Sequence, residues 1–147
     1  MFRVSSNKQK KCIQTGRRYR DATVYLSRQG PDVVDLSICA WSRQAIPAIM
    51  YGVESIIFSE SNIEALERVQ GSWARNTLSL PAACPGVVAQ MLLGVPTAKQ
   101  VIYTTQLKYF LRLTQLPSSR YAAKALLEHE TGGWKSPYLA NNGQNPG

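Results

Sequence analysis

The sequence predicts an all-α protein: a small bundle of five to six helices, with a loose basic arm at the amino terminus and a loose tail at the carboxy terminus. Three observations lead to this prediction. Apolar residues recur at intervals of three and four, Gly and Pro separate the resulting segments, and no stretch alternates as a strand does. At 147 residues, of which 44% are hydrophobic, the chain is long enough for one domain with a real core.

The first thirty residues are expected to form an arm that is partly helical. A helix fits residues 9–29, because several apolar side chains fall near one face: Ile13, Tyr19, Ala22 and Leu26. Gly16 weakens the middle of this helix, and Gly30-Pro31 ends it. Residues 1–8 have no pattern and are expected to fray.

The next helix begins near Asp32 or Asp35, since either carboxylate can cap a helix amino terminus. It is predicted to run to about Met50. Pro47 cannot donate a backbone hydrogen bond, so a kink is expected there. Residues 56–58 (Ile-Ile-Phe) either finish this helix or stretch into an extended link, and the periodicity fits both.

A capping box marks the start of the following helix, because Ser61 can accept from the amide of Glu64 while the Glu64 side chain reaches back. The apolar residues after it form one helical stripe: Ile63, Leu66, Val69, Trp73 and Leu80. Pro81 stops this helix. A short helix then fits residues 87–93, closed by Gly94.

The helix over residues 98–116 is the most distinctive in the chain. Thr97 and Gln100 form a capping box at its start. Its apolar residues cover an arc of roughly 220°, about twice what an ordinary surface helix needs. We therefore expect it to pack against elements on two sides. A last helix is predicted over residues 118–130.

These elements give a domain organisation of an arm (1–30), a helical domain (31–131) and a turn-rich flexible tail (132–147). The net charge of +8 is concentrated in the arm, where eight basic side chains and one acidic one give +7. The rest of the chain is nearly neutral. Such an asymmetry suggests a polyanionic partner, and the alternative is a solvated tail.

The cysteine and histidine content argues against a metal site. Cys12, Cys39 and Cys84 form no CxxC pair, and His129 is the single histidine. We interpret the three cysteines as reduced thiols of an intracellular protein, nuclear or cytoplasmic, with Cys39 in the core. No secretory signal is recognised, and charges interrupt the most apolar stretch, which argues against a membrane span: Asp35, Arg43 and Glu54.

The pattern of nucleotidyl-transfer enzymes is missing from this sequence. That reaction needs carboxylates that hold two divalent metals, and no Asp-Asp or Asp-x-Asp pair follows an apolar strand-like stretch. Residues 128–130 (Glu-His-Glu) are neighbours whose side chains point apart on a helix. No nucleophile elbow, Walker loop or dinucleotide-binding glycine pattern occurs. The sequence predicts no catalytic residues, no metal and no cofactor.

Two groups of residues are candidates for binding a nucleic-acid backbone. Binding of cationic side chains to phosphates is favoured because it releases counterions. Hydrogen-bond donors aligned along one helix face can contact successive phosphates of a backbone. The candidates are, in the arm, Lys8, Lys10, Lys11, Arg17, Arg18 and Arg20, and, on the helix over residues 98–116, Thr104, Lys108, Arg112 and Gln115. The alternative for the second group is the solvated side of a buried helix. Tyr19 could stack on a base or face the core, and Trp41 and Trp73 are predicted core residues.

An ordered set of short motifs runs through the middle of the chain: Trp41, Pro47, Ala48, Ile49, Tyr51, Gly52 and Glu54, then Ile63, Leu66, Glu67, Val69 and Gln70, then Leu78, Leu80 and Pro81, then Leu93 and Gly94. This set resembles the region that follows the catalytic palm in reverse transcriptases of LINE-type (non-LTR) retrotransposons. The likeness covers residues 17–116. The palm motif itself is not present.

The resemblance implies a helical, thumb-like segment that grips a template–primer duplex, with RNA or an RNA–DNA duplex backbone as partner. It also implies a transposable-element origin. Without the palm aspartates, we expect a non-catalytic fragment of an RNA-directed DNA polymerase. The alternative is a helical protein-interaction piece, or a retrotransposon remnant without selected function, that contacts the missing palm or associates with itself.

Overall fold

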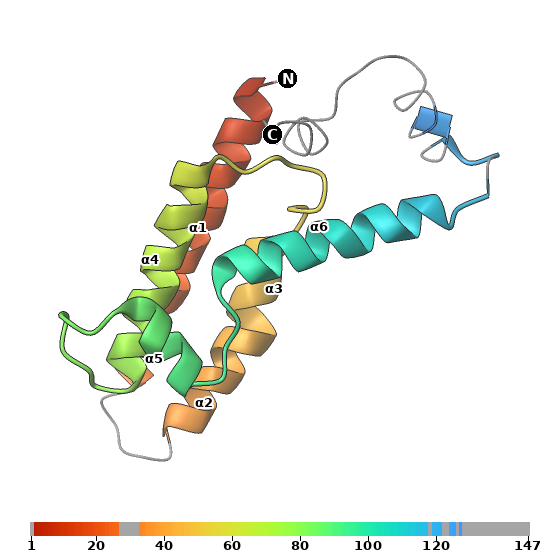
Figure 1. Cartoon of the computed structure of the whole chain (residues 1–147). Coiled ribbons are helices and arrows are strands. Elements are labelled where there is room, and N and C mark those ends of the chain that lie inside the picture. The colour runs from red at the N-terminus through yellow and green to blue at the C-terminus, as the bar shows by residue number, and fades with distance from the viewer. Residues whose placement is uncertain (1, 27–32, 118, 122–123, 126, 128–147) are drawn as a thin grey trace, which may run out of the picture. The chain divides into compact units, whose positions relative to one another are not determined.

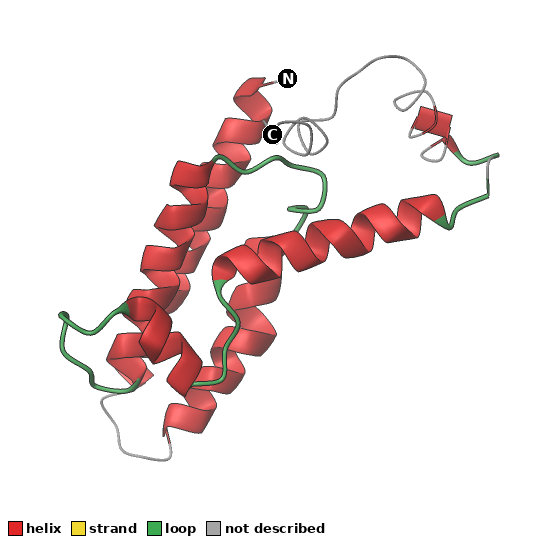
Figure 2. Cartoon of the chain, in the orientation of Figure 1, coloured by secondary structure: helices red, strands yellow, loops and turns green. Residues whose placement is uncertain are grey.

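The computed structural model describes residues 2–26, 33–117, 119–121, 124, 125 and 127. Within these residues every regular element is a helix (Figure 2), so the predicted all-α fold class is confirmed. The chain divides into two compact units, Met1–Gln106 and Leu107–Gly147. The tail predicted over residues 132–147 lies outside the described residues.

Helix α1 spans Phe2–Leu26 and begins well before the predicted start at Gln9. It packs along α4, which spans Glu60–Thr77 (Figure 1). Cys12 and Ile13 of α1 are buried in the core. Residues 2–26 of the segment predicted as a partly helical arm thus form one long helix of the bundle, because its buried side continues the apolar core.

Gly16 lies where α1 closely approaches two neighbouring helices, α4 and α3. A Cβ atom at this position would lie 3.3 Å from a methyl group of Val69 and 3.4 Å from one of Ile49. The low helix propensity of glycine is therefore offset by the close approach that it allows.

Three helical elements follow one another without a gap: α2 (Val33–Ala40), the π-helical segment η1 (Trp41–Ala45) and α3 (Ile46–Met50). The N–H of Ile46 donates to the carbonyl of Trp41, five residues earlier. Pro47 lies in the first turn of α3. A proline has no N–H for the carbonyl one turn back, and the widened π-helical turn stands at the place where the sequence predicted a kink.

Residues 51–59 link α3 to α4 and contain no helix. This settles the alternatives for residues 56–58 in favour of an extended link. Ile56 and Phe58 are buried, whereas Ile57 between them is exposed. Alternation of this kind is typical of extended backbone, and it brings two apolar side chains into the core.

The start of α4 differs from the prediction. The N-cap residue is Ser59, without a side-chain capping hydrogen bond, so the predicted capping box at Ser61 is wrong. Gln9 of α1 supplies part of the capping at the amino terminus of α4. Its Oε1 accepts from the N–H of Ser59 at 3.2 Å and from the Asn62 side chain. Gln9 Nε2 donates to the carbonyl of Ile57 at 2.7 Å.

The direction of α1 relative to α4 follows from these contacts. Gln9 meets Asn62, and Gly16 meets Val69, so both helices run in the same direction (Figure 1). The predicted stripe of α4 is confirmed up to Trp73, and Leu80 lies beyond the end of the helix. The buried apolar core consists of Cys12, Ile13, Trp41, Ala45, Ile49, Val53, Ile56, Phe58, Ile63, Leu66, Val69, Trp73, Ala74, Ala89, Val95, Ala98 and Ile102.

Helix α4 ends in a Schellman motif, in which the chain turns through a left-handed residue. The N–H of Leu80 donates to the carbonyl of Arg75 at 2.8 Å, and that of Ser79 donates to Asn76 at 3.2 Å. The left-handed residue is Ser79, with φ at 53°. A side chain at such a φ is unfavourable, and glycine usually occupies the position.

Helix α5 spans Gly86–Leu92 and ends in a second Schellman motif. The N–H of Val95 donates to the carbonyl of Gln90 and that of Gly94 to Met91, each at 3.0 Å. Gly94 has φ at 66°. The prediction that Gly94 closes this helix is confirmed.

The α5 helix packs on α4 through two glycines. A Cβ atom on Gly71 of α4 would lie 2.9 Å from the Cα of Gly86, a separation that real side chains essentially never show. The two backbones therefore approach as closely as they do because neither residue carries a side chain.

Helix α6 spans Ala98–Thr114. The predicted capping box is confirmed, because the N–H of Gln100 donates to Thr97 Oγ1 at 3.2 Å and the N–H of Thr97 donates to Gln100 Oε1 at 3.0 Å. Ala98 and Ile102 are buried. The boundary between the two units falls inside this helix.

The apolar arc of α6 is not packed on two sides among the described residues, which differs from the prediction. Five of its large apolar residues are exposed: Tyr103, Leu107, Tyr109, Phe110 and Leu111. Most of the helix predicted over residues 118–130 lies outside the described residues, although positions 121, 124, 125 and 127 are helical.

Candidate nucleic-acid interface

Four cations form two rows on the exposed side of α1. Lys10 and Arg17 make one row, Lys11 and Arg18 make the other, and all four are exposed. Positions seven apart on an α-helix lie within about 20° of each other around the axis and about 10.5 Å apart along it. Within the described part of the chain, none of the four cations has an ion-pair partner.

The buried side of α1 fixes the direction of this cationic face. Gln9, Cys12 and Thr23 are buried on the opposite side of the helix. Thr23 Oγ1 donates to the carbonyls of Tyr19 and Arg20, at 2.9 Å each, so this polar side chain is satisfied within its own helix. The burial of one side therefore keeps the other side, with its cations, in solvent.

A stripe of uncharged and acidic residues separates the two rows of cations. It contains Asn7, Gln14 and Asp21, all exposed. Arg20 Nη2 lies 2.7 Å from the Asp21 carboxylate, so the negative charge on this face is partly offset by a neighbour. Sequence reasoning selected the cations but missed Asn7, Gln14 and Tyr25, which the helical phase of Lys11 and Arg18 would have found.

The other two cations predicted for the arm are already engaged. The ammonium of Lys8 lies 6.0 Å from the centre of the Tyr51 ring, within cation–π range, and Arg20 pairs with Asp21. Tyr19 is partly buried against the core, which agrees with its core-facing alternative. Ala22, predicted on the apolar side with Tyr19, is exposed instead.

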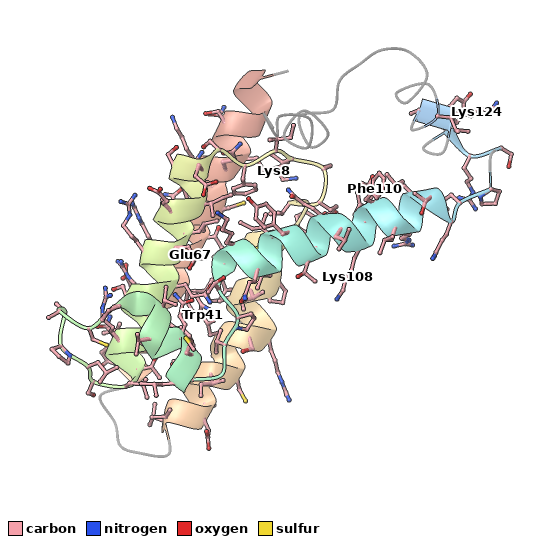
Figure 3. The ribbon with its side chains drawn as sticks, viewed as in Figure 1. Lys8, Trp41, Glu67, Lys108, Phe110 and Lys124 are labelled. Atoms are coloured by element: carbon pink, nitrogen blue, oxygen red, sulfur yellow. The ribbon has the colours of Figure 1, made fainter. Side chains whose placement is uncertain are left out.

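The second predicted group lies on and just after α6. Thr104 belongs to the first unit, and Lys108, Arg112 and Gln115 belong to the second. All four are exposed. Lys108 and the apolar Phe110 point to opposite sides of the helix (Figure 3), as their spacing of two residues requires.

Two arginines of α4 have different surroundings. Arg75 Nη1 donates to the carbonyl of Cys84 at 3.2 Å and so holds the loop before α5. Arg68 is exposed, and it has no ion-pair partner among the described residues. Arg75 therefore has a structural contact, whereas Arg68 is available to solvent.

The acidic residues of the described part form no cluster of three or more with His or Cys that could hold a metal ion. Glu60 pairs with Lys99 at 2.8 Å, and a Glu67 carboxylate oxygen accepts from the N–H of Lys99 at 2.8 Å. The Glu60 contact raises the pKa of Lys99. These acids therefore join α4 to the start of α6. Residues 128–130 lie outside the described residues.

The cysteines differ from the prediction. Cys39 is exposed, so its predicted place in the core is wrong, and Cys12 is the buried one. Burial raises the pKa of the Cys12 thiol, partly opposed by the nearby charge of Lys8. A raised pKa keeps this thiol protonated and unreactive, which fits a packing role.

None of the described helices combines the length and the apolar character that crossing a membrane requires. No protein-family model, no curated protein and no solved structure matches this chain.

Proposed function

We propose that this chain is a non-catalytic, thumb-like helical module that holds the sugar–phosphate backbone of RNA or of an RNA–DNA duplex. The observation that carries the proposal is the cationic face of α1, formed by Lys10, Lys11, Arg17 and Arg18. These side chains are exposed and have no ion-pair partner within the described residues. Their charges are therefore free to neutralise phosphates.

The rigidity of this face supports the proposal. Helix α1 is 25 residues long, which corresponds to about 37 Å, and its far side packs on α4 and α3. The cations are presented from a packed helix, so they are not charges of a solvated tail. A fixed row of cations can follow a polyanion without reading its sequence.

The resemblance to the post-palm region of LINE-type reverse transcriptases supports the same function. Several residues of the shared motifs are core residues here, including Trp41, Ile49 and Val69. Motif residues that build a packed bundle are expected of a thumb-like module. The proposal includes no nucleotide-joining chemistry and no cofactor.

A titration of a labelled RNA–DNA duplex with the purified chain, at several salt concentrations, tests this function. Backbone binding predicts measurable affinity at low salt that falls linearly on a double-logarithmic plot against salt. Affinity that does not change with salt, or no binding at low salt, would contradict the proposal. Incorporation of nucleotides in the presence of magnesium would contradict its non-catalytic part.

A second candidate function, association between copies of this helical module, has its own supporting observation. Four apolar residues of α5 are exposed: Val87, Val88, Met91 and Leu92. No charged residue occurs between positions 76 and 98, so the exposed apolar side chains of α5 have no charged neighbours within their own segment of the chain. Exposed apolar patches commonly mark protein contacts.

Sedimentation over a range of protein concentrations tests the second function. Self-association predicts a mass that rises with concentration and returns to that of a monomer in the double variant Met91→Lys and Leu92→Lys. A monomer at all concentrations would contradict it. The nucleic-acid titration is independent of this result, because α5 and the cationic face of α1 share no residue.

A further inference from the structure

We infer that Tyr25 is a stacking platform for an unpaired base, so that the cationic face of α1 prefers a strand with a free base over a fully paired duplex. The inference rests on the proposed function and adds the kind of nucleic acid that the face selects. It is carried by the position and exposure of a single aromatic ring.

The ring of Tyr25 is 74% exposed, although α1 has a buried side that could have taken it. Tyr19, six residues earlier on the same helix, packs against the core. Six residues turn an α-helix by roughly 240°, so the two tyrosines have different environments. Tyr25 therefore has no packing role in the described structure, and its apolar ring faces solvent.

Tyr25 continues one of the two rows of cations. Lys11, Arg18 and Tyr25 are spaced seven residues apart, so each lies about 10.5 Å beyond the last and nearly in line with it. A strand whose phosphates contact Lys11 and Arg18 is thereby led toward the ring. Proteins that bind single strands typically combine cationic side chains along the backbone with aromatic side chains on which bases stack.

The residues around Tyr25 favour a base over a phosphate at this place. Helical side chains lie over the turn before their own Cα, which for Tyr25 is the turn with Asp21 and Ala22. The small Ala22 side chain leaves the ring accessible, and the Asp21 side chain is 66% exposed. A carboxylate disfavours a phosphate beside it, whereas a neutral base can stack on the ring.

Base pairing decides which nucleic acid can use the platform. A base inside a duplex is stacked on both faces, so only an unpaired or terminal base can offer a free face to Tyr25. Stacking on an aromatic side chain tolerates any base, because every base has a π-face. The inference therefore specifies strandedness and not sequence.

Three probes of equal charge separate stacking from charge: a labelled oligothymidine that spans α1, an abasic phosphodiester of the same length, and a blunt RNA–DNA duplex with the same number of phosphates. The variants are Tyr25→Ala and, as matched control, Tyr25→Phe, which keeps the ring. We expect Tyr25→Ala to weaken oligothymidine binding about five- to 140-fold. We expect Tyr25→Phe to bind as the wild type, and both variants to bind the abasic strand unchanged.

Each other outcome contradicts the inference. Equal losses on oligothymidine and the abasic strand would mean that Tyr25 acts through the fold, which thermal unfolding of Tyr25→Ala would show. If Tyr25→Ala binds oligothymidine as tightly as the wild type does, Tyr25 is not a stacking platform. In that case salt-dependent duplex binding would leave the proposed function standing, whereas absence of binding by the wild type to every probe would contradict both.

Discussion

The indole rings of Trp41 and Trp73 stack in the core, with centroids 4.5 Å apart and planes inclined by 12°. They join η1 to α4. The two N–H groups differ, however. Trp73 Nε1 donates to Ser37 Oγ at 3.2 Å, whereas the buried Trp41 Nε1 has no hydrogen-bond partner among the described residues. The same ring pair thus contains one satisfied and one unsatisfied donor.

This asymmetry predicts different effects of removing each N–H. Trp73→Phe deprives Ser37 of a donor, whereas Trp41→Phe removes an N–H that has no hydrogen-bond partner within the described part of the chain. We expect the free energy of unfolding to fall by about 1–3 kcal/mol more for Trp73→Phe than for Trp41→Phe. Urea denaturation of the two variants measures the difference. Equal losses would show that ring volume alone matters at both positions.

The contact between Gly71 and Gly86 predicts that alanine at position 71 destabilises the protein. In an open helix, Gly→Ala gains about 1 kcal/mol. Here the new Cβ meets backbone at 2.9 Å, and overpacking costs about 1–3 kcal/mol. Urea denaturation should therefore show a lower midpoint for Gly71→Ala. The exposed Asn76→Ala change, on the same helix, is the control and should not lower stability.

The two Schellman motifs predict opposite changes in stability for two substitutions at their left-handed residues, Ser79→Gly and Gly94→Ala. Ser79 has φ at 53°, so Ser79→Gly should raise the free energy of unfolding by about 0.5–1 kcal/mol. Gly94 has φ at 66°, and no atom of the described residues lies within 4 Å of an added Cβ. Gly94→Ala should therefore cost about 1 kcal/mol through the backbone alone. Thermal unfolding of both variants tests the pair, and destabilisation by Ser79→Gly would refute the strain at that residue.

The pairing of Arg20 with Asp21 predicts that removal of this acid strengthens nucleic-acid binding. Asp21→Asn takes a negative charge from the cationic face and releases Arg20 from its partner at 2.7 Å. Affinity for the duplex should rise. The slope of log affinity against log salt concentration should become steeper by about the amount that one phosphate contact contributes. Glu64→Gln, on the exposed side of α4, changes the net charge equally and should have a smaller effect. If the two variants behave alike, the position of Asp21 is irrelevant.

Local sequence patterns predicted the later helices well. The apolar stripe from Ile63 to Trp73, the capping box of Thr97 and Gln100, and the closing role of Gly94 all depend on residues within a turn or two of one another. Such features are visible in sequence because their hydrogen bonds and contacts are local.

Features that depend on distant residues were not predictable in the same way. The α4 start shifted because Gln9, about fifty residues away along the chain, binds the backbone at Ser59. Cys39 was expected in the core but is exposed, whereas Cys12 of α1 is buried, because burial follows from how the helices pack and not from the residue type. Of the candidate site, the sequence identified the cations, whereas separating Lys10 from the engaged Lys8 required the position of Tyr51.

The central claim is that the arrangement of cations on α1, and not the net charge, holds nucleic acid. Two variants of equal net charge test it: Gln at positions 10, 11, 17 and 18, and Gln at four exposed cations outside both candidate groups, Arg43, Arg68, Arg120 and Lys124. The quantity measured is the slope of the logarithm of duplex affinity against the logarithm of salt concentration. We predict that the magnitude of this slope falls by up to about 3.6 in the first variant. The second variant should keep most of its slope and affinity. Equal losses in the two variants, or a larger loss in the second, would contradict the account.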